Sequence, residues 1–445
     1  MIVLGGGIGG MATALSLHAA GNPCRVYESS PEVKPLGVGI NVLPHSVREL
    51  TELGLLPRLE EIGIRTQELV YATKRGEIVW REPRGEFAGY NWPQFSVHRG
   101  HLQMMLYEVV LERMGKDAVV TDHEAVDVTQ DGTSATAHFR SRTTGAALPS
   151  VSGDVVVAAD GIHSNIRAKF YPDEGPPVWS HRILWRGTTI RKPFLTGASM
   201  VLAGYAWKKW VCYPIRQLND GIQLINWIAE LTFDSTSIHA PEDWNRLGKL
   251  EDFMPDFEKW NFDWMPVADI IRGAQSIYEY PMSDRNPVPS WVFGRTALLG
   301  DAAHAMYPIG SNGASQAILD ARRLAYELAT RSDVNEALAA YDADRRPATA
   351  KLLELTRAEG PDAVLQLVEE RAPDGFADLE QVARLAVREA VAARYKSAAG
   401  FDRETLNRKP SLNARWPGAA PAGRASAGRP PTRASPTAAG PRCVQ

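Results

Sequence analysis

The sequence predicts an α/β fold, α+β overall, in which a nucleotide-binding domain carries an inserted sheet domain and ends in helices. Three observations support this prediction. Residues 2–28 have the pattern of a strand, a glycine turn, a helix, a second strand and an acid. Residues 181–290 hold more than half of the 12 tryptophans, in stretches that alternate as the strands of a mixed or antiparallel sheet do. From residue 297 onward, the pattern of buried strands and helices returns.

The first strand is followed by the turn GGGIGG at residues 5–10, which satisfies the pattern G-x-G-x-x-G. In a dinucleotide site Gly5 permits the tight turn, Gly7 lets the backbone approach a pyrophosphate, and Gly10 lets the helix pack closely on the strand. The N-terminus of that helix presents free N–H groups to the phosphates. Glu28, after the second strand, is placed to accept hydrogen bonds from ribose hydroxyls. Because an acid would repel a 2′-phosphate, this Rossmann-like unit predicts FAD or NAD rather than NADP.

The composition is ordinary for an enzyme and argues against several other classes. Apolar residues make up 44% of the chain and charged residues 23%. The net charge is -3, and because residues 410–445 hold five arginines and no acid, the preceding body is near -8, which leaves no broad basic surface for nucleic acid. Cys24, Cys212 and Cys443 are widely spaced, so we expect no disulfide framework and no metal site. The glycine motif begins the chain and no apolar stretch approaches 18 residues, so we expect a cytoplasmic protein without signal peptide or membrane span.

Residues 1–180 are expected to form the first part of the nucleotide-binding domain, with a small sheet inserted in it. The expected helices cover residues 44–53 and 101–114. The expected strands are a pair within 67–80 and short antiparallel strands at 119–120, 125–128 and 135–140. The continuous apolar run at 155–159 is typical of a strand that is buried on both faces of a parallel sheet.

Residues 181–290 are expected to form the substrate-binding sheet domain, with strands at 183–190, 210–215 and 222–229. Residues 291–360 are expected to return to the nucleotide-binding domain, with helices at 314–328, 334–343 and 347–359. Further helices are expected within 361–409. Residues 410–445 are rich in Pro, Ala and Arg and lack an apolar period, so we expect a disordered tail.

Two further motifs follow the glycine turn in a specific order. The first is DGIHSNIR at 160–167, and the second is GDAAH at 300–304, followed by PIGSNGA at 308–314. Over about residues 1–360 the three motifs resemble those of the single-component (group A) flavoprotein aromatic hydroxylases, such as salicylate and para-hydroxybenzoate hydroxylases. The stretches PLGVGI at 35–40, SVHRGHLQ at 96–103 and MYPIGSNGASQAILD at 306–320 look closer still to the phenazine-hydroxylase branch. The resemblance implies the FAD-binding fold of para-hydroxybenzoate hydroxylase.

The resemblance implies that FAD lies between the glycine turn and the third motif. The residues that it implies as cofactor contacts are Gly5, Gly7, Ile8, Gly9, Gly10, Glu28, Ser29, Val38, Arg99, Gln103, Val126, Asp160, Asp301, Pro308, Gly310, Gly313 and Ala314. Purely structural roles are the alternatives. Asp301 would then be an N-terminal helix cap, and the second motif would be a turn at the end of a strand, with Ser164 as a helix cap. In the third motif Gly310 and Gly313 let backbone N–H groups face the flavin, and the helix that starts near Ala314 directs its positive end toward it.

The resemblance also implies a reaction. NADH or NADPH reduces the flavin, and O₂ then reacts to give a flavin C4a-hydroperoxide that hydroxylates an aromatic ring. The expected substrate is an aromatic or N-heteroaromatic compound, with a carboxylated one and loss of CO₂ left open. The chain has only one nucleotide fingerprint, so the nicotinamide cofactor is expected to bind transiently. We expect a monomer or homodimer whose partner is a small aromatic substrate.

The sequence does not single out a catalytic base. His304 and Tyr213 are candidates, although the family pattern favours a structural role for His304. Trp185, Arg186, Tyr213 and Met306 are candidates for the substrate site, beside the alternative that the aromatic residues belong to an ordinary core. Other functions weighed are an epoxidase or reductase on the same scaffold, acting on a polyketide or isoprenoid, and a non-catalytic nucleotide-binding module. The latter would leave Asp301 and the loop after Pro308 without a purpose.

Overall fold

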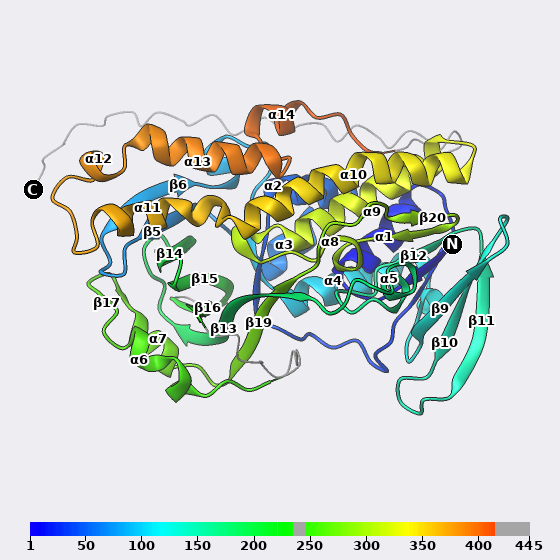
Figure 1. Ribbon diagram of the computed structural model, residues 1–445, viewed down its shortest axis with the longest axis horizontal. Coiled ribbons are helices and arrows are strands. Elements are labelled where there is room, and N and C mark those ends of the chain that lie inside the picture. The colour runs from blue at the N-terminus through cyan, green and yellow to red at the C-terminus, as the bar shows by residue number, and fades with distance from the viewer. Residues whose placement is uncertain (220, 235–245, 414–445) are drawn as a thin grey trace, which may run out of the picture. The chain divides into compact units, whose positions relative to one another are not determined.

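The computed structural model describes residues 1–219, 221–234 and 246–413, and one compact unit runs from Met1 to Ala414. Two large sheets organise this unit (Figure 1). The expected domain boundaries at residues 180, 290 and 360 stay predictions, because the contacts do not divide the unit there. Cys443 and residues 414–445 of the expected disordered tail lie outside the described residues. The expectation is wrong for the first four residues of that tail, because Pro410 accepts a hydrogen bond from Arg48 (2.6 Å) and Asn413 accepts one from Arg322 (2.7 Å).

The central sheet has six strands in the order β20-β21-β12-β1-β2-β8. Its strands are β1 (Ile2–Leu4), β2 (Arg25–Tyr27), β8 (Val119–Val120), β12 (Val156–Ala158), β20 (Val292–Phe293) and β21 (Thr296–Leu298). β1 lies in the middle and pairs in parallel with β12 and β2, and its residues are buried on both faces as their apolar character predicts. The expected α/β fold class is confirmed.

Helices α1 (Ile8–Ala19), α4 (Arg99–Met114) and α9 (Gly313–Thr330) cover the central sheet, and α1 packs against the other two. β8 differs from the expectation of an antiparallel strand, because it pairs in parallel with β2. The short 3-10 helix η2 (Lys116–Ala118) connects α4 to β8. After this connection β8 runs in the same direction as β2.

Two small antiparallel sheets and two helices complete this side of the unit. The sheets are β9 (Glu124–Gln130), β10 (Ala135–Arg140) and β11 (Ala147–Gly153), and β3 (Gly39–Val42), β4 (Gly63–Arg65) and β7 (Phe95–His98). The helices between β3 and β4 are α2 (Pro44–Glu52) and α3 (Leu56–Ile62). The sheet β3-β7-β4 brings chain segments that are far apart in sequence to the wall of the site described below.

The second large sheet has seven strands in the order β19-β13-β16-β15-β14-β5-β6. Its strands are β5 (Glu68–Ala72), β6 (Ile78–Pro83), β13 (Val178–Arg191), β14 (Ser199–Tyr205), β15 (Lys208–Asn219), β16 (Ile222–Thr232) and β19 (Ile277–Asp284). The expected strand pair within 67–80 exists as β5 and β6. It joins this sheet by parallel pairing of β5 with β14, rather than staying with the residues 1–180 that surround it in sequence. One face of the sheet is covered by α6 (Met254–Phe257), α7 (Val267–Arg272) and the small strands β17 (Asn261–Phe262) and β18 (Met265–Pro266).

The prediction of two helices separated at Pro347 is wrong, because α10 (Val334–Arg357) is continuous through that proline. Proline removes one hydrogen bond from the helix interior. Buried side chains on both sides of it, Tyr341 before and Leu352 after, hold the two halves in one line. Local propensity is therefore overridden by packing.

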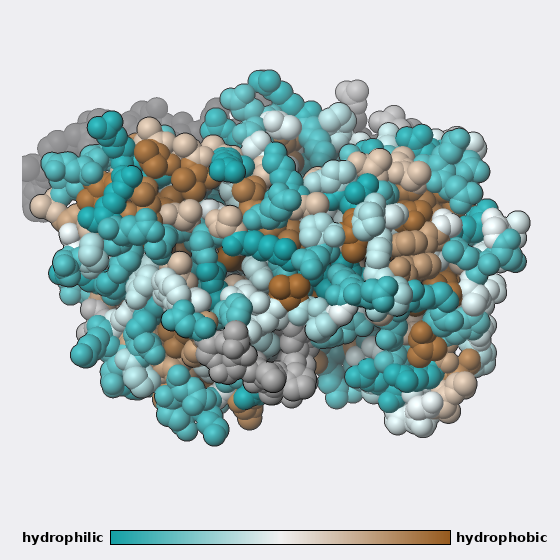
Figure 2. All heavy atoms as spheres, in the orientation of Figure 1, coloured by the Kyte–Doolittle hydropathy of each residue, from teal (hydrophilic) through white to brown (hydrophobic). Residues whose placement is uncertain are grey.

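The remaining helices are α5 (Asn165–Phe170), α8 (Asp301–His304), α11 (Ala363–Arg371), α12 (Leu379–Val382), α13 (Leu385–Ala398) and α14 (Arg403–Arg408). α10 and α11 run along one side of the unit, where α10 packs on α9 and α11 packs on β14 (Figure 1). Within the described residues, no helix combines the length and apolar character that crossing a bilayer requires. On the face that Figure 2 shows, apolar side chains form separate patches among polar ones.

Candidate active site

One cavity joins the glycine turn, the third motif and the second sheet. Three neighbouring parallel strands, β1, β12 and β21, end at the same edge of the central sheet, and the cavity of about 370 Å³ opens there. Its lining includes residues 7–9 of the glycine turn, 300–301 of the third motif, and most of the loop 308–314. The opposite wall is one face of the seven-stranded sheet. Ligands of open α/β sheets bind at this carboxyl edge.

The glycine turn has the geometry of a cradle for a phosphate group. Gly5 has a φ of +100°, and a Cβ at Gly10 would overlap the carbonyl oxygen of Gly5, so both positions need glycine for the fold itself. A Cβ at Gly7 would meet no atom within 4 Å. Space is therefore kept open above Gly7, next to the N-terminus of α1, which no side chain caps. These features fit a pyrophosphate.

Glu28 lies beside this turn at the end of β2. Its carboxylate accepts hydrogen bonds from the backbone N–H of Gly6 (2.5 Å) and of Ser30 (2.7 Å), and from the hydroxyl of Ser29 (3.2 Å). Oε1 accepts two of these bonds and Oε2 accepts one, so Oε2 keeps acceptor capacity for a ribose hydroxyl. Glu28 and Ser29 are half-buried and do not line the cavity.

Arg99 and Gln103 lie one turn apart on α4 but reach different places. Arg99 lines the cavity; burial lowers the pKa of its guanidinium, and the carboxylate of Asp301 opposes this. Gln103 donates to the carbonyl of Gly6 (2.9 Å) and so holds the glycine turn. Val38 accepts a hydrogen bond from the backbone N–H of Arg99 (2.8 Å) and lies outside the cavity lining.

The second motif holds the third motif in place. Burial raises the pKa of Asp160 to about 6, and its Oδ1 has no hydrogen-bond partner in the described part of the chain. Ser164 accepts from the backbone N–H of Arg167 (2.9 Å) and caps α5, so this bare structural role is present. Sequence reasoning missed the part played by Arg167, which donates to the carbonyls of Ala302 (3.0 Å) and Ala303 (2.7 Å) in α8.

The loop after Pro308 is held from behind by the C-terminal helix α13. The hydroxyl of Tyr395 donates to the carbonyl of Ile309 (3.1 Å) and accepts from the amide of Asn312 (2.8 Å). Gly310 has a φ of +72°, and a Cβ there would overlap the Tyr395 ring. α9 begins at Gly313, and the cavity lining includes Gly313 and Ala314, so its N-terminal end faces the cavity.

His304 is not a residue of this cavity, so its candidacy as a base is wrong. Its Nε2 is hydrogen-bonded to Asp320 (2.5 Å), and its ring packs on Trp291. Asp320 is fully buried in α9 and also accepts from Arg345 Nε (2.7 Å) and from the backbone N–H of Gly300 (3.2 Å). The histidine thus belongs to a buried ionic cluster that supports the turn before Asp301.

The expectation that Trp185 lines the substrate cavity is also wrong. Successive side chains of a strand point to opposite faces, so Leu184 and Arg186 line the cavity and Trp185 points away. Trp185 stacks on Phe253 (ring centroids 5.0 Å apart). It shares that covered face with Trp210 and other aromatic residues of the sheet, which form a core under α6 and α7.

The other three substrate candidates, Arg186, Tyr213 and Met306, do line the cavity. Arg186 Nη2 donates to the carbonyl of Gly39 (2.8 Å). Burial raises the pKa of Tyr213 to about 12. Its phenol is therefore protonated at neutral pH, and the role of base that the sequence analysis considered for it stays a prediction. Val126 lies on β9, is 37% exposed and does not line the cavity, so a cofactor contact there stays a prediction.

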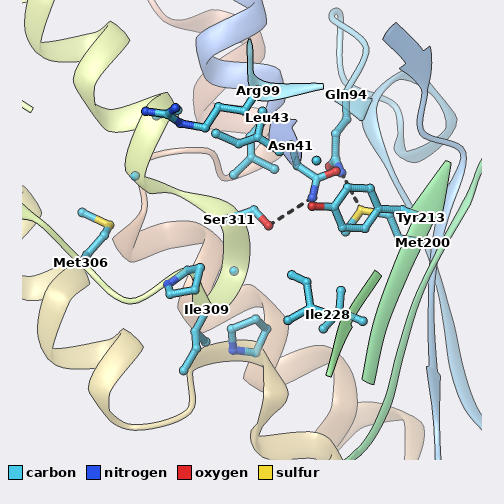
Figure 3. A pocket seen from close by; sticks show the side chains of 18 of the residues that line it. Asn41, Leu43, Gln94, Arg99, Met200, Tyr213, Ile228, Met306, Ile309 and Ser311 are labelled. Carbon is cyan, nitrogen blue, oxygen red and sulfur yellow. Dashed lines mark hydrogen bonds between the residues drawn. The ribbon is translucent and has the colours of Figure 1, made fainter. Parts of the chain in front are cut away.

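Sequence reasoning also missed two carboxamides at the substrate end of the cavity, Asn41 on β3 and Gln94 before β7. Figure 3 shows both beside Met200 and Tyr213. Neither stands in a recognisable motif. Only the pairing of β3 with β7, which sets Asn41 opposite Ser96, brings them to one wall.

Comparison with known proteins identifies this arrangement. A family model for an FAD binding domain matches residues 1–177 and 273–356, and leaves out β13 to β16 between them. Over 401 residues the chain is 41% identical to phenazine 1,6-dicarboxylic acid hydroxylase PhzS of Lysobacter antibioticus, covering 89% of this chain and 96% of that protein. The chain belongs to the FAD-dependent aromatic hydroxylases. It is an FAD-dependent monooxygenase that hydroxylates an aromatic substrate, with NAD(P)H and O₂ as the reactants standard for the family.

Two further relatives agree with this assignment. The 3-amino-4-hydroxybenzoate 2-monooxygenase PtmB3 of Streptomyces platensis is 32% identical over 384 residues, which cover 83% of this chain and 91% of that protein. A salicylate hydroxylase in complex with its substrate has the same fold, with a TM-score of 0.70 at 22% identity, covering 94% of this chain and 98% of that one. The hydroxylase fold therefore extends over nearly all of the described residues.

Proposed function

We propose that this hydroxylase acts on a planar, polycyclic N-heteroaromatic acid, with FAD extending from the glycine turn to the loop 308–314. The observation that carries the proposal is the single cavity that runs from Gly7 past Asp301 to the second sheet. The 41% identity to a phenazine 1,6-dicarboxylic acid hydroxylase supports the substrate class. The aliphatic character of the substrate end supports it too, since flat aromatic faces pack well against such walls.

In this proposal the chain holds the cofactor at four places. The glycine turn and Glu28 bind the ADP half, Arg99 lies between the halves, and Asp301 binds the ribityl chain. Pro308, Gly310, Gly313 and Ala314 face the ring system, where the positive end of α9 stabilises negative charge. When bound, FAD takes a hydride from NAD(P)H and activates O₂ for transfer of one oxygen atom to the aromatic ring.

The residues around the substrate contribute positioning and exclusion of water. Leu69, Leu202, Val211 and Ile228 give the cavity apolar walls that keep water from the reacting atoms. Arg186 supplies a cation for an acidic group of the substrate. Tyr213, protonated at neutral pH, can donate a hydrogen bond but not take a proton. Electron density for the reaction then comes from the substrate itself, and attack at a carboxylated carbon would release CO₂.

The decisive experiment measures NADH and NADPH oxidation by the purified, FAD-loaded protein with and without phenazine-1,6-dicarboxylic acid. We expect the acid to stimulate oxidation and to be converted to a hydroxylated product, with little H₂O₂. Benzenedicarboxylates, which carry the same charge, are the control and should stimulate less, because they fill less of the cavity. Unchanged oxidation with every aromatic acid, or H₂O₂ as the only product, would rule out the proposed substrate class.

We expect Asp301→Ala and Glu28→Arg to weaken FAD binding by about 10- to 100-fold, the range for losing hydrogen bonds to a charged group. Asp301 is exposed at the cavity, so its loss should leave the thermal stability of the apoprotein unchanged. Titration of apoprotein with FAD, followed by flavin fluorescence, measures the effect. Glu108→Ala, in an exposed ion pair on α4, is the control. Equal flavin affinity in all three variants would contradict the assignments.

A further inference from the structure

Gln94 is a buried carboxamide at the substrate end of the cavity whose donor has only a weak partner. Its side chain lines the cavity and the residue is 2% exposed. Its side-chain Nε2 donates to the thioether sulfur of Met200 (3.4 Å), and this is its only side-chain hydrogen bond to the residues that the structure describes (Figure 3). Thioether sulfur is a poor acceptor. Burying an amide without a strong partner is costly, so such a group indicates a place for a ligand acceptor.

The position of Gln94 is fixed by its backbone. The backbone carbonyl of Gln94 accepts a hydrogen bond from the backbone N–H of Thr66 (2.8 Å). The backbone nitrogen of Gln94 lies so close to Gly85 that a Cβ on residue 85 would overlap it. Gly85 accordingly has a φ of +52°. The carboxamide is therefore presented to the cavity from a rigid segment, as a specificity residue requires.

The neighbouring polar side chains each have at least one partner among the described residues, although Nε of Arg84 and Nε of Arg186 have none there. The amide of Asn41 donates to Ser311 Oγ (3.3 Å), and its oxygen accepts from Ser96 Oγ (2.7 Å). Arg186 is hydrogen-bonded to the carbonyl of Gly39. Arg84 and Lys396, further along the cavity, both pair with Glu82. With the phenol of Tyr213, Gln94 is thus a neutral donor of this wall that a bound ligand would satisfy.

We infer that Gln94 recognises a ring nitrogen of the substrate. An unprotonated nitrogen of an aza-aromatic ring is a neutral acceptor whose lone pair lies in the ring plane, and its counterpart must be a neutral donor that reaches the ring edge. A carboxylate of the substrate is better bound by a cation, and the cavity offers a cation at Arg186, which lies on another strand. Leu69, Met200 and Leu202, which line the same cavity, leave the ring faces in apolar contact. This inference rests on the proposed function and specifies how the site selects its substrate.

A matched pair of ligands tests the inference. Phenazine-1,6-dicarboxylic acid and anthracene-1,5-dicarboxylic acid have the same ring framework and the same number of carboxylates, but C–H groups replace both ring nitrogens in the second. Their dissociation constants are measured by calorimetry on the FAD-loaded protein. We expect the wild type to prefer the phenazine by about tenfold, the value of one buried neutral hydrogen bond. Gln94→Met, which keeps the length of the side chain, should bind both ligands equally.

Two further variants make the result specific. Gln94→Leu should also abolish the preference, which covers a failure of Gln94→Met to fold. Gln223→Leu removes a buried glutamine that is bonded to the carbonyl of Gly197 (2.9 Å), outside the cavity, and should keep the preference. A preference that persists in both Gln94 variants overturns the inference and leaves the proposed substrate class intact. If the wild type binds neither ligand, the proposed function fails and the inference fails with it.

Discussion

Gly7→Ala is expected to leave the apoprotein as stable as the wild type while weakening FAD binding by about tenfold or more. Gly7 has an ordinary φ of -73°, and a Cβ there would meet no protein atom within 4 Å. The methyl group would instead occupy the space through which the backbone approaches the pyrophosphate. Thermal unfolding of the apoprotein and FAD titration of the same sample separate the two effects.

Gly10→Ala is the matched opposite. A Cβ at Gly10 would overlap the carbonyl oxygen of Gly5, so α1 would have to move away from β1. We expect this variant to destabilise the apoprotein by about 1–3 kcal/mol, the usual cost of overpacking, even without FAD. If Gly7→Ala bound FAD as tightly as the wild type, the phosphates would not pass over Gly7. If Gly7→Ala destabilised the apoprotein as much as Gly10→Ala does, the space above Gly7 would not be free of protein atoms.

The cofactor end of the site could be read from the sequence because its requirements are local. Gly5 and Gly310 have positive φ values, and a Cβ at Gly10 has no room, so in each case the backbone alone demands glycine. Three such motifs in one order predicted the fold, and the cavity that joins Gly7 to Asp301 unites them as expected.

The substrate end could not be read in the same way. Trp185 and Arg186 were both candidates, and alternation on a strand means that only one of two neighbouring side chains can face the cavity, without deciding which. The concentration of tryptophan reflects the core under α6 and α7, which pack on the face of the sheet away from the cavity. Gln94 lies in a connecting segment with no periodic pattern, and its role depends on the packing of β5, β7 and β14. Such long-range arrangements leave no local signal in a single sequence.

The second prediction with a large expected effect concerns the ionic cluster behind the third motif. We expect Asp320→Asn to lower the free energy of unfolding. Asp320 is fully buried and faces His304, Arg345 and the backbone N–H of Gly300. Removing one member of a buried ion pair leaves the other charge uncompensated, so we expect a loss of about 3–5 kcal/mol in the free energy of unfolding. Glu108→Gln, in an exposed pair with Arg58, should change stability far less.

The pH dependence of this loss identifies its cause. Burial alone would raise the pKa of Asp320, but His304 and Arg345 together hold that pKa below its ordinary value. A carboxylate with a lowered folded-state pKa stabilises the protein above its unfolded-state pKa, near 4, and ceases to do so as the pH falls below it. The stability difference between wild type and Asp320→Asn should therefore be full at pH 7 and shrink in acid, as denaturant unfolding at several pH values would measure. Because Asp320 also binds Gly300, the variant should release the turn that presents Asp301 and lower FAD affinity. A difference that does not change with pH would mean that shape, and not charge, holds this turn.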